Sequence, residues 1–326
     1  IVIVYEWRCF TISGKPIWQT DVADAEAGYA LTLSPLIVKD KVIVGIAGGE
    51  YGIRGFISAY DVNTGEEAWK FYTIPGPGEP GHETWQDDDW MYGGASAWIT
   101  GSYDPDTDLV YWGIGNPGPD WNPEQRPGDN LYSDSVVALN PDTGELEWYF
   151  QFTPNDPYDY DSVQVPVLVD YPAQDGSMLK LMLFGNRNGF FYILDRATGR
   201  FINGEPYIDL NWAEGLDDVG RPIFTPQPPG TTTYPGVQGG TNWYSPSYSP
   251  STRLFYMSTW EGNGSNFEAQ EAEYEPGRTF LGGRPAPPVP GAALPNLARG
   301  PINTWTESAG TGAVKALDPA TGEERW

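Results

Sequence analysis

The sequence repeats one phrase, which reads AYDVNTGEEAW at residues 59–69 and ALNPDTGELEW at residues 138–148. Three altered or shortened copies read SGKPIW at 13–18, LDRATG at 194–199 and ALDPATGEERW at 316–326. In four copies an apolar stretch ends at Asp or Asn, whose short side chain can bond the backbone of a turn, and a glycine follows within four residues. In four of the five copies Trp stands four residues after the glycine, where a new strand would begin. Each copy therefore predicts a β-hairpin, with the glycine at a position of positive φ.

A second self-match lies outside this phrase. Six residues recur 145 positions later in the chain: Trp98, Tyr103, Pro105, Thr107, Leu109 and Tyr111 match Trp243, Tyr248, Pro250, Thr252, Leu254 and Tyr256. Repeats of this length, with strand-turn-strand content and a fixed aromatic residue, predict the blades of a β-propeller. We expect Trp18, Trp69 and Trp148 of the repeated phrase to lock neighbouring blades together. No helix longer than a turn is expected, and residues 276–301 are expected to form a long loop between strands.

The composition limits the classes of protein to which the chain can belong. Its 326 residues carry 18 basic and 44 acidic side chains, a formal net charge of −26, which repels phosphate backbones and argues against nucleic-acid binding. No apolar run approaches the roughly 20 residues that a membrane-spanning helix needs. The single cysteine, Cys9, excludes an internal disulfide. The single histidine, His82, excludes a His-rich metal site and argues against a Ser-His-Asp triad.

Both ends of the chain are expected to lie inside a larger domain. Ile1 begins within a stretch typical of a strand, and Trp326 stops at the point of the repeat where a new strand should begin. A propeller needs a closed ring. We therefore expect residues 1–326 to form a single β-propeller domain that is truncated at both ends.

Three segments far apart in the sequence place oxygen-bearing side chains in turns rich in Gly or Pro. They read AGGEYGIRG at 47–55, GIGNPGPDWN at 113–122 and TPNDPYDYD at 153–161. If the third segment is extended, Asp159 and Asp161 face the same side, where they repel each other unless a cation or a shared proton lies between them. Oxygen donors without His or Cys indicate an ion like calcium or a lanthanide rather than zinc. Taken singly, each segment is also typical of an ordinary solvated turn.

The order and the residues of these segments resemble those of the methanol and ethanol dehydrogenases that depend on pyrroloquinoline quinone (PQQ). The resemblance runs from about Thr20 to Trp326 and rests on five motifs: GGEYGIRG at 48–55, GNP at 115–117, RPGDN at 126–130, DYD at 159–161 and NRNG at 186–189. It implies an all-β fold, the eight-bladed propeller of the quinoproteins with PQQ on its axis. This chain would form somewhat more than half of that ring.

The resemblance also implies roles for single residues in the metal site. Glu50 and Asn116 match the family's metal ligands, and Asp159 matches its catalytic base, which also lies close to the metal. Asp161 matches an extra aspartate that the lanthanide-using members carry two residues after the base. Three carboxylates neutralise a trivalent ion, whereas around a divalent ion they leave excess negative charge. A lanthanide(III) ion is therefore favoured over calcium, and the alternative is that Asp161 turns to solvent.

Further residues match the family's contacts with the quinone. Trp98 matches the indole that forms one wall of the PQQ site. Arg187 matches the cation beside the reactive carbonyl, where it would stabilise a developing oxyanion. The remaining predicted PQQ contacts lie along the edge of the quinone: Thr32, Ala47, Gly48, Gly49, Ser96 and Asn242.

The function that the resemblance implies is the oxidation of a primary alcohol to an aldehyde. Asp159 would remove the alcohol proton while hydride passes to metal-bound PQQ. The resemblance further implies a c-type cytochrome as electron acceptor and a periplasmic or secreted location, and it allows a homodimer. Two alternatives stay open: a PQQ dehydrogenase for a larger substrate such as polyvinyl alcohol, and a non-catalytic propeller that serves as a binding scaffold.

Overall fold

The computed structural model describes residues 6–173, 175–228, 231–285 and 310–326, and strands dominate them. Within these ranges the helical elements are five 3-10 turns of three residues each, so the expectation of an all-β chain is confirmed. The turns are η1 (Ala25–Ala27), η2 (Gly49–Tyr51), η3 (His82–Thr84), η4 (Asp89–Met91) and η5 (Pro123–Gln125). No helix in the described part of the chain is long and apolar enough to span a membrane.

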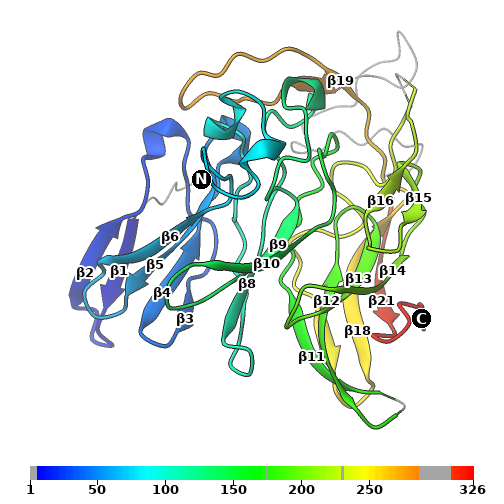
Figure 1. The fold of residues 1–326 in the computed structure, drawn as a ribbon, viewed down its shortest axis with the longest axis horizontal. Coiled ribbons are helices and arrows are strands. Elements are labelled where there is room, and N and C mark those ends of the chain that lie inside the picture. Colours follow the sequence, from blue (N-terminus) through cyan, green and yellow to red (C-terminus); the bar gives the residue numbers. More distant parts are fainter. Residues whose placement is uncertain (1–5, 174, 229–230, 286–309) are drawn as a thin grey trace.

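Three antiparallel sheets of four strands follow one another along the chain, each in sequential strand order. The first holds β3 (Leu36–Val38), β4 (Lys41–Gly45), β5 (Phe56–Asp61) and β6 (Glu67–Tyr72). The second holds β7 (Ser102–Asp104), β8 (Leu109–Gly113), β9 (Ser135–Leu139) and β10 (Leu146–Gln151). The third holds β11 (Val167–Pro172), β12 (Met178–Gly185), β13 (Phe190–Asp195) and β14 (Phe201–Pro206). These sheets are the predicted blades, fanned side by side in Figure 1.

Smaller sheets complete the described structure. The hairpin of β1 (Glu6–Phe10) and β2 (Pro16–Asp21) precedes the first blade, and a three-stranded sheet of β17 (Ser247–Ser249), β18 (Leu254–Glu261) and β21 (Thr311–Leu317) follows the third. Two further hairpins pair β15 (Ala213–Leu216) with β16 (Pro222–Phe224), and β19 (Phe267–Ala269) with β20 (Gly283–Pro285). The expectation of one long loop over 276–301 is therefore wrong for β20, and residues from 286 onward in that stretch lie outside the described residues.

The repeated phrase forms hairpins as predicted. Between β5 and β6, the Asp61 carboxylate accepts hydrogen bonds from the backbone N–H groups of Asn63 and Thr64, at 2.8 and 2.9 Å. Gly65 then adopts a φ of 74°, in the left-handed region that favours glycine. The copy between β9 and β10 repeats this arrangement, with Asn140 in place of the aspartate and a φ of 74° at Gly144.

The repeat tryptophans join each blade to the next. The indole of Trp69, in the first blade, packs over Gly144 in the second, where an added Cβ would lie 2.6 Å from the ring. Its Nε1–H donates to the Pro141 carbonyl at 2.9 Å. Trp18 packs in the same way over Gly65, and Trp148 over Gly199, so the predicted role of these tryptophans is confirmed.

The third blade makes this joint with a different side chain. Its copy of the phrase has Asn203 at the position of the tryptophan, and the Asn203 amide donates to the Thr321 carbonyl at 2.8 Å. Thr321 belongs to the last copy of the phrase, next to Gly322. The third blade is therefore joined to the next turn by a hydrogen bond from a side-chain amide to a backbone carbonyl. This bond is of the same kind as the one that the indole of Trp69 makes.

We expect Trp69→Ala to destabilise the protein by about 3–5 kcal/mol, because the substitution empties a packed joint between two blades. Guanidinium unfolding would measure this loss as a lower midpoint. Val219→Ala is a suitable control, since Val219 is 67% exposed and a surface substitution of this kind changes stability by only about 0.5 kcal/mol. Equal midpoints for the two variants would contradict the assigned role of Trp69.

The second self-match also corresponds to equivalent strands. β7 pairs with β8 so that Ser102 faces Tyr111, and β17 pairs with β18 so that Ser247 faces Tyr256. The tyrosine hydroxyl bonds a threonine four residues earlier at 2.8 Å in both hairpins. The 145-residue offset therefore relates two copies of one blade-opening hairpin in the same register.

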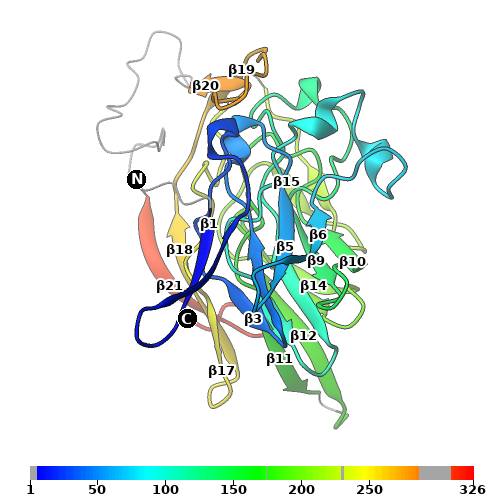
Figure 2. The same ribbon diagram turned by 90° about the vertical axis from the view of Figure 1, so that its left-hand side faces the viewer.

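The topology sends the candidate site residues to one end of the propeller. Because strands alternate in direction, the connection from the second to the third strand of a blade lies at the same end as the connection to the next blade. The repeated turns join the third and fourth strands and lie at the opposite end. The first strands converge, since β11 contacts both β7 and β17. Figures 1 and 2 show long loops gathered above the blades, at the end away from the β11–β12 turn.

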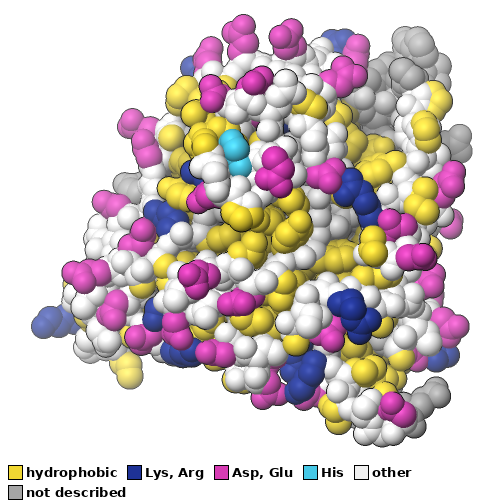
Figure 3. Space-filling view, in the orientation of Figure 1, with side chains coloured by type: hydrophobic (Ala, Val, Ile, Leu, Met, Phe, Trp, Pro, Cys, Tyr) yellow, Lys and Arg dark blue, Asp and Glu magenta, His cyan; other side chains and the backbone are white. Residues whose placement is uncertain are grey.

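The core lies between the blades. The central strands of the first blade bury Ile43, Val44 and Ile57 completely, and those of the second bury Trp112 and Val137. Burying such side chains stabilises the fold by about 1.5–3 kcal/mol each. On the face shown in Figure 3, hydrophobic side chains gather toward the centre, while acidic side chains are spread around the edge.

Candidate functional site

Three loops meet at Asn116, which follows β8. The backbone of Gly115 donates to the Ser96 carbonyl at 2.7 Å, and the backbone of Ala95 donates to the Asn116 carbonyl at 2.9 Å. A Cβ added at Gly49 would lie 3.2 Å from the Ser96 hydroxyl and 4.0 Å from the Asn116 side-chain oxygen. The amide oxygen of Asn116 therefore faces the turn that holds Gly49 and the adjacent Glu50.

Six of the residues predicted to contact PQQ, Thr32, Ala47, Gly48, Gly49, Ser96 and Trp98, lie on three connections between strands. The Thr32 hydroxyl donates to the Trp98 carbonyl at 2.8 Å. Ala47 pairs with Ala30, through backbone hydrogen bonds of 2.8 and 3.0 Å, on the same stretch as Gly48 and Gly49. Gly48 has a φ of 116°, and a Cβ there would collide with the Gly28 carbonyl, so the backbone approach requires glycine.

Asn242 lies on the connection between β16 and β17. Its side chain bonds within its own loop, donating to the Gln238 carbonyl at 3.0 Å and accepting from the Trp243 backbone at 2.9 Å. This loop rests on the arginine of the site, because the backbone of Gly240 donates to the Arg187 carbonyl at 3.0 Å.

Arg187 holds the two acids of the DYD motif. Its Nη1 lies 2.5 Å from Asp161 Oδ2, and its Nη2 lies 3.3 Å from Asp159 Oδ2. The guanidinium is buried and also donates from Nε to the Val237 carbonyl at 2.9 Å. The second oxygen of Asp161 accepts from the backbone N–H of Asn116 at 3.0 Å, which links the DYD loop to the Asn116 loop.

The DYD segment differs from its predicted shape but not from its predicted orientation. It is not a strand, since Asp159 has a φ of 62°, an uncommon conformation for a residue other than glycine. Both carboxylates nevertheless face one cation, as the sequence predicts. The alternative that Asp161 turns to solvent is wrong, because Asp161 is only 6% exposed and both of its oxygens have partners.

The electrostatic environment suits Asp159 to proton transfer. Burial raises the pKa of its carboxyl well above the usual value, Arg187 opposes this shift, and the negative charges of Asp161, Asp120 and Glu50 add to it. A carboxylate with a raised pKa is a stronger base than an exposed one. The strained backbone and the raised pKa at one residue are typical of an active site.

The structure adds Asp120 to the predicted residues. Asp120 is 2% exposed, and its Oδ1 has no hydrogen-bond partner. Burial raises the pKa of its carboxyl well above the usual value, the negative charges of Glu50 and Asp161 add to this shift, and Arg126 opposes it. It lies within the segment 113–122, but an aspartate after Gly-Pro is also typical of a turn, so no sequence signal distinguishes it.

Arg126 of the RPGDN motif has a structural part in the site. It is fully buried and donates to the carbonyls of Pro119, Asp120 and Asp156 and to the side chain of Asn130. Its donors are directed at backbone and amide oxygens rather than at carboxylates. Arg126 therefore fixes the loop that carries Asn116 and Asp120 against the loop that carries Asp159.

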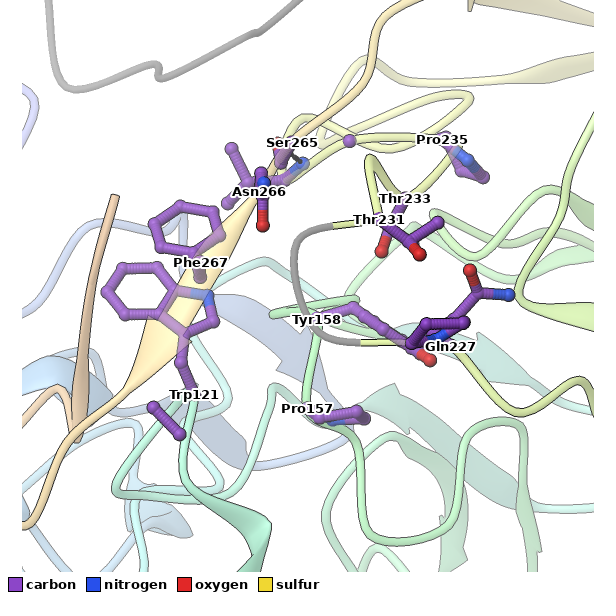
Figure 4. A pocket seen from close by; sticks show the side chains of 14 residues that line it. Trp121, Pro157, Tyr158, Gln227, Thr231, Thr233, Pro235, Ser265, Asn266 and Phe267 are labelled. Carbon is purple, nitrogen blue, oxygen red and sulfur yellow. Dashed lines mark hydrogen bonds between the residues drawn. The ribbon is translucent and has the colours of Figure 1, made fainter. Parts of the chain in front are cut away.

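A cavity of about 180 Å³ lies beside the loop that carries the two acids (Figure 4). Trp121 and Phe267 form one wall, with their rings stacked at 4.1 Å between centroids and 8° between planes. Tyr158, the neighbour of Asp159, and Val237, whose carbonyl binds Arg187, also line it. The other lining residues are Pro157, Gln227, Pro228, Thr231, Thr233, Pro235, Gly236, Ser265, Asn266 and Ala269. The cavity thus lies next to the loop that carries Asp159, and its wall combines aromatic and proline side chains with polar ones.

The oxygen atoms of these side chains suit a hard cation, although the side chains are not arranged closely around one point. Among the described residues, no three acidic, His or Cys side chains stand together closely enough to hold an ion as they are placed. The Glu50 side chain is exposed to solvent, and Asp161 forms an ion pair with Arg187. The group offers carboxylate and amide oxygens together with the unpartnered oxygen of Asp120, and such oxygen donors match calcium-like and lanthanide-like ions.

A β-propeller that gathers a buried arginine, several carboxylates and an amide among the loops at one end has the framework of a quinoprotein dehydrogenase. The family model described as "Glucose/ethanol/alcohol dehydrogenase, beta-propeller domain", which carries the label PQQ, matches residues 10–204. The chain belongs to this family.

Individual relatives agree with this assignment. The chain is 38% identical to the quinoprotein alcohol dehydrogenase PedH of Pseudomonas putida, over 96% of this chain and 54% of that protein. It is 38% identical to the lanthanide-dependent methanol dehydrogenase of Methylacidiphilum fumariolicum, over 83% of this chain and 48% of that protein. The chain thus spans about half the length of these curated relatives. Their names are those of dehydrogenases and do not favour the non-catalytic scaffold.

A solved structure confirms the type of fold. The europium-containing methanol dehydrogenase superposes with a TM-score of 0.87 at 33% identity, covering 99% of this chain and 58% of that one. The prediction of a quinoprotein propeller, with somewhat more than half of the ring in this chain, is confirmed.

Proposed function

We propose that the protein oxidises a primary alcohol to an aldehyde with PQQ and a metal ion bound among the loops at this end of the propeller. The observation that carries the proposal is the contact of Arg187 with both Asp159 and Asp161 within a chain of the PQQ dehydrogenase family. A base with a raised pKa beside a fixed cation suits the removal of a proton from an alcohol, and a cavity lies next to the loop that carries this base.

Each residue has a definite part in this proposal. Glu50, Asn116, Asp159 and Asp161 would hold the ion, and Trp98 with Thr32, Ala47, Gly48, Gly49, Ser96 and Asn242 would hold PQQ. When bound, the quinone supplies a two-electron acceptor whose carbonyl is polarised by the ion. Asp159 accepts the proton of the alcohol hydroxyl. Arg187 would orient Asp159 and stabilise the negative charge that develops on the oxygen of the reactive quinone carbonyl.

The proposed ion is a lanthanide(III) rather than calcium. Asp161 is buried beside Asn116, so Glu50, Asp159 and Asp161 would present three negative charges to one ion. A trivalent ion balances this charge, whereas a divalent ion leaves the carboxylates repelling one another. The similarity to a relative named as lanthanide-dependent supports the same choice.

Partners and location are proposed from the relatives' names and from the sequence resemblance. One relative, 33% identical over 96% of this chain, is named methanol dehydrogenase [cytochrome c] subunit 1 of Methylorubrum extorquens. We propose a c-type cytochrome as electron acceptor, and its reduction in the presence of alcohol would test this. The periplasmic or secreted location, the homodimer and the single domain over residues 1–326 stay predictions.

The function is tested with the purified full-length protein, freed of metal and then given PQQ with La³⁺ or Ca²⁺. We expect ethanol-dependent reduction of an artificial electron acceptor, which stops when either PQQ or the ion is left out. If no alcohol is oxidised with either ion although PQQ is bound, the proposal is wrong.

The cavity favours alcohols larger than methanol among the possible substrates. Its volume of about 180 Å³ and its wall of Trp121 and Phe267 suit an aromatic or branched chain. We expect Trp121→Ala to lower kcat/KM for benzyl alcohol about tenfold, because the loss of apolar contacts weakens binding of the ring. Ethanol should be affected much less. An equal change for both alcohols would place the substrate elsewhere.

A further inference from the structure

One segment from late in the chain lies against the loops of the first two blades. Residues 267–285, here called the strap, begin with β19, end with β20 and follow β18 of the three-stranded sheet. In Figure 1 the strap runs across the top of the molecule, over the loops that connect the blades. Because it meets residues that come much earlier in the chain, the strap can hold loops of different blades together.

The strap is fixed to the loop between β8 and β9. The side-chain amide of Asn122 donates to the Gln270 carbonyl at 3.0 Å. Gln125 donates to the Ala272 carbonyl at 3.0 Å and accepts from the backbone N–H of Ala272 at 2.9 Å. The second blade therefore binds the backbone of the strap at two places, which sets the path of the strap over the site.

The strap also contacts the turn that carries Glu50. The backbone N–H of Phe280 donates to the Glu50 carbonyl at 2.7 Å. The Phe280 side chain is buried, and a Cβ added at Gly52 would lie 3.1 Å from its ring and 2.9 Å from the ring of Tyr274. Tyr274 in turn stacks on Tyr92, with 4.4 Å between the ring centroids. Two rings of the strap therefore pack over Gly52, two residues after Glu50.

The turn itself has little in its own sequence to hold it in one conformation. η2 lies between Gly48 and Gly52, whose φ angles are 116° and 64°. Glycine loses more conformational freedom on folding than any other residue, so a turn with a glycine at each end is costly to fix. The contacts from the strap offset part of this cost on the Gly52 side, and they act on the backbone of Glu50 itself.

We propose that Phe280 is a positioning residue of the metal site, through which the strap holds the Glu50 turn where its carboxylate can bind the ion. The proposal rests on the proposed function, because it assumes that Glu50 is a ligand of that ion. Groups just outside the ligands of a metal orient those ligands, and their loss typically lowers metal affinity by about 10- to 100-fold. The ring of Phe280 anchors the strap at Gly52, so its removal frees the turn.

The experiment measures ion affinity in a double-mutant cycle. The full-length protein carrying PQQ is freed of metal and titrated with La³⁺ against a chelator, for the wild type, Phe280→Ala, Glu50→Ala and the double variant. We expect Phe280→Ala to lower the La³⁺ affinity about tenfold. In the Glu50→Ala background the same substitution should have almost no further effect, because a residue that acts through another gives a non-additive change.

Two further variants separate this effect from a general loss of stability. Phe280→Leu keeps most of the apolar volume and should restore most of the La³⁺ affinity. Phe201 follows the repeated turn of the third blade, at the end of the propeller away from the site, where its ring stacks on Phe150. Phe201→Ala should lower the unfolding midpoint and leave the La³⁺ affinity unchanged. If Phe280→Ala does not fold, Tyr274→Ala takes its place in the cycle, since it removes the other ring over Gly52.

The outcomes distinguish this inference from the function on which it rests. An unchanged La³⁺ affinity in Phe280→Ala, or effects of Phe280→Ala and Glu50→Ala that simply add, overturns the role of Phe280. The function stands in that case if the wild type binds La³⁺ and oxidises alcohol. An unchanged affinity in Glu50→Ala overturns both the role of Phe280 and the assignment of Glu50 as a ligand. A wild-type protein that binds PQQ but no ion overturns the inference and the proposed function together.

Discussion

Replacing Asp159 by asparagine is expected to abolish alcohol oxidation and leave the fold intact. The substitution removes the base but keeps the shape of the side chain, and the loss of a general base typically lowers the rate by about 10²- to 10⁴-fold. Arg187 contacts Asp159 less closely than Asp161: its Nη2 lies 3.3 Å from Asp159 Oδ2, and its Nη1 lies 2.5 Å from Asp161 Oδ2. Arg187 therefore stays anchored by Asp161 and by Val237 in the variant. The rate is measured with PQQ, the preferred ion and an artificial electron acceptor.

The control for this variant lies far from the site. Asp175 is exposed in the turn between β11 and β12, at the opposite end of the propeller from the DYD loop. Asp175→Asn should leave the rate unchanged. Near-normal turnover by Asp159→Asn, with bound PQQ verified, would refute its role as the base.

Replacing Asp161 by alanine is expected to remove the preference for a lanthanide ion. The wild-type protein should be more active with La³⁺ or Ce³⁺ than with Ca²⁺, since three carboxylates balance a trivalent charge. Without Asp161 the proposed ligands keep two carboxylates, Glu50 and Asp159, and Arg187 loses the closer of its two carboxylate partners. We expect activity with La³⁺ to fall by at least about tenfold, as typically follows the loss of a group that supports a metal site.

The comparison uses metal-free full-length protein reconstituted with PQQ and each ion in turn. Asp161→Asn removes the charge and keeps one acceptor oxygen, which can bind either the Asn116 N–H or Arg187 but not both. It should also lose the lanthanide preference, while Arg187 keeps its bonds to Val237 and Asp159. Equal or better activity of the wild type with Ca²⁺ would mean that Asp161 is not a lanthanide ligand.

The parts of the fold that the sequence predicts are those set by local contacts. In the repeated phrase, the side chain of Asp61 or its equivalent accepts hydrogen bonds from the backbone of the residues two and three positions later. The glycine that follows has a positive φ, so each hairpin is encoded within about ten residues. The joint between blades could also be predicted, because the same Trp recurs at one position and must meet the same surface of the next repeat. Asn203 shows the limit of this reasoning, since its bond to Thr321 is visible only in the structure.

The residues of the candidate site could be proposed from the sequence, whereas the contacts between them could not. The motifs GGEYGIRG, GNP, DYD and NRNG point to Glu50, Asn116, Asp159 and Arg187 through the family resemblance. The strand topology explains why these residues lie at one end of the propeller. The pairing of Arg187 with Asp161 joins residues 26 apart across two loops, and no local pattern encodes it. The same holds for Asp120, which lies buried where Arg126 joins its own loop to the loop that carries Asp156.

The most direct measurement of the central claim is the recovery of bound cofactor from the purified full-length protein. The protein is denatured, the released small molecule is identified by its absorbance and mass, and its amount is compared with that of the protein. We expect about one PQQ for each polypeptide, either as purified or after incubation with PQQ and La³⁺. A protein that folds and releases no PQQ under either condition would contradict the assignment of this propeller as a PQQ-binding dehydrogenase.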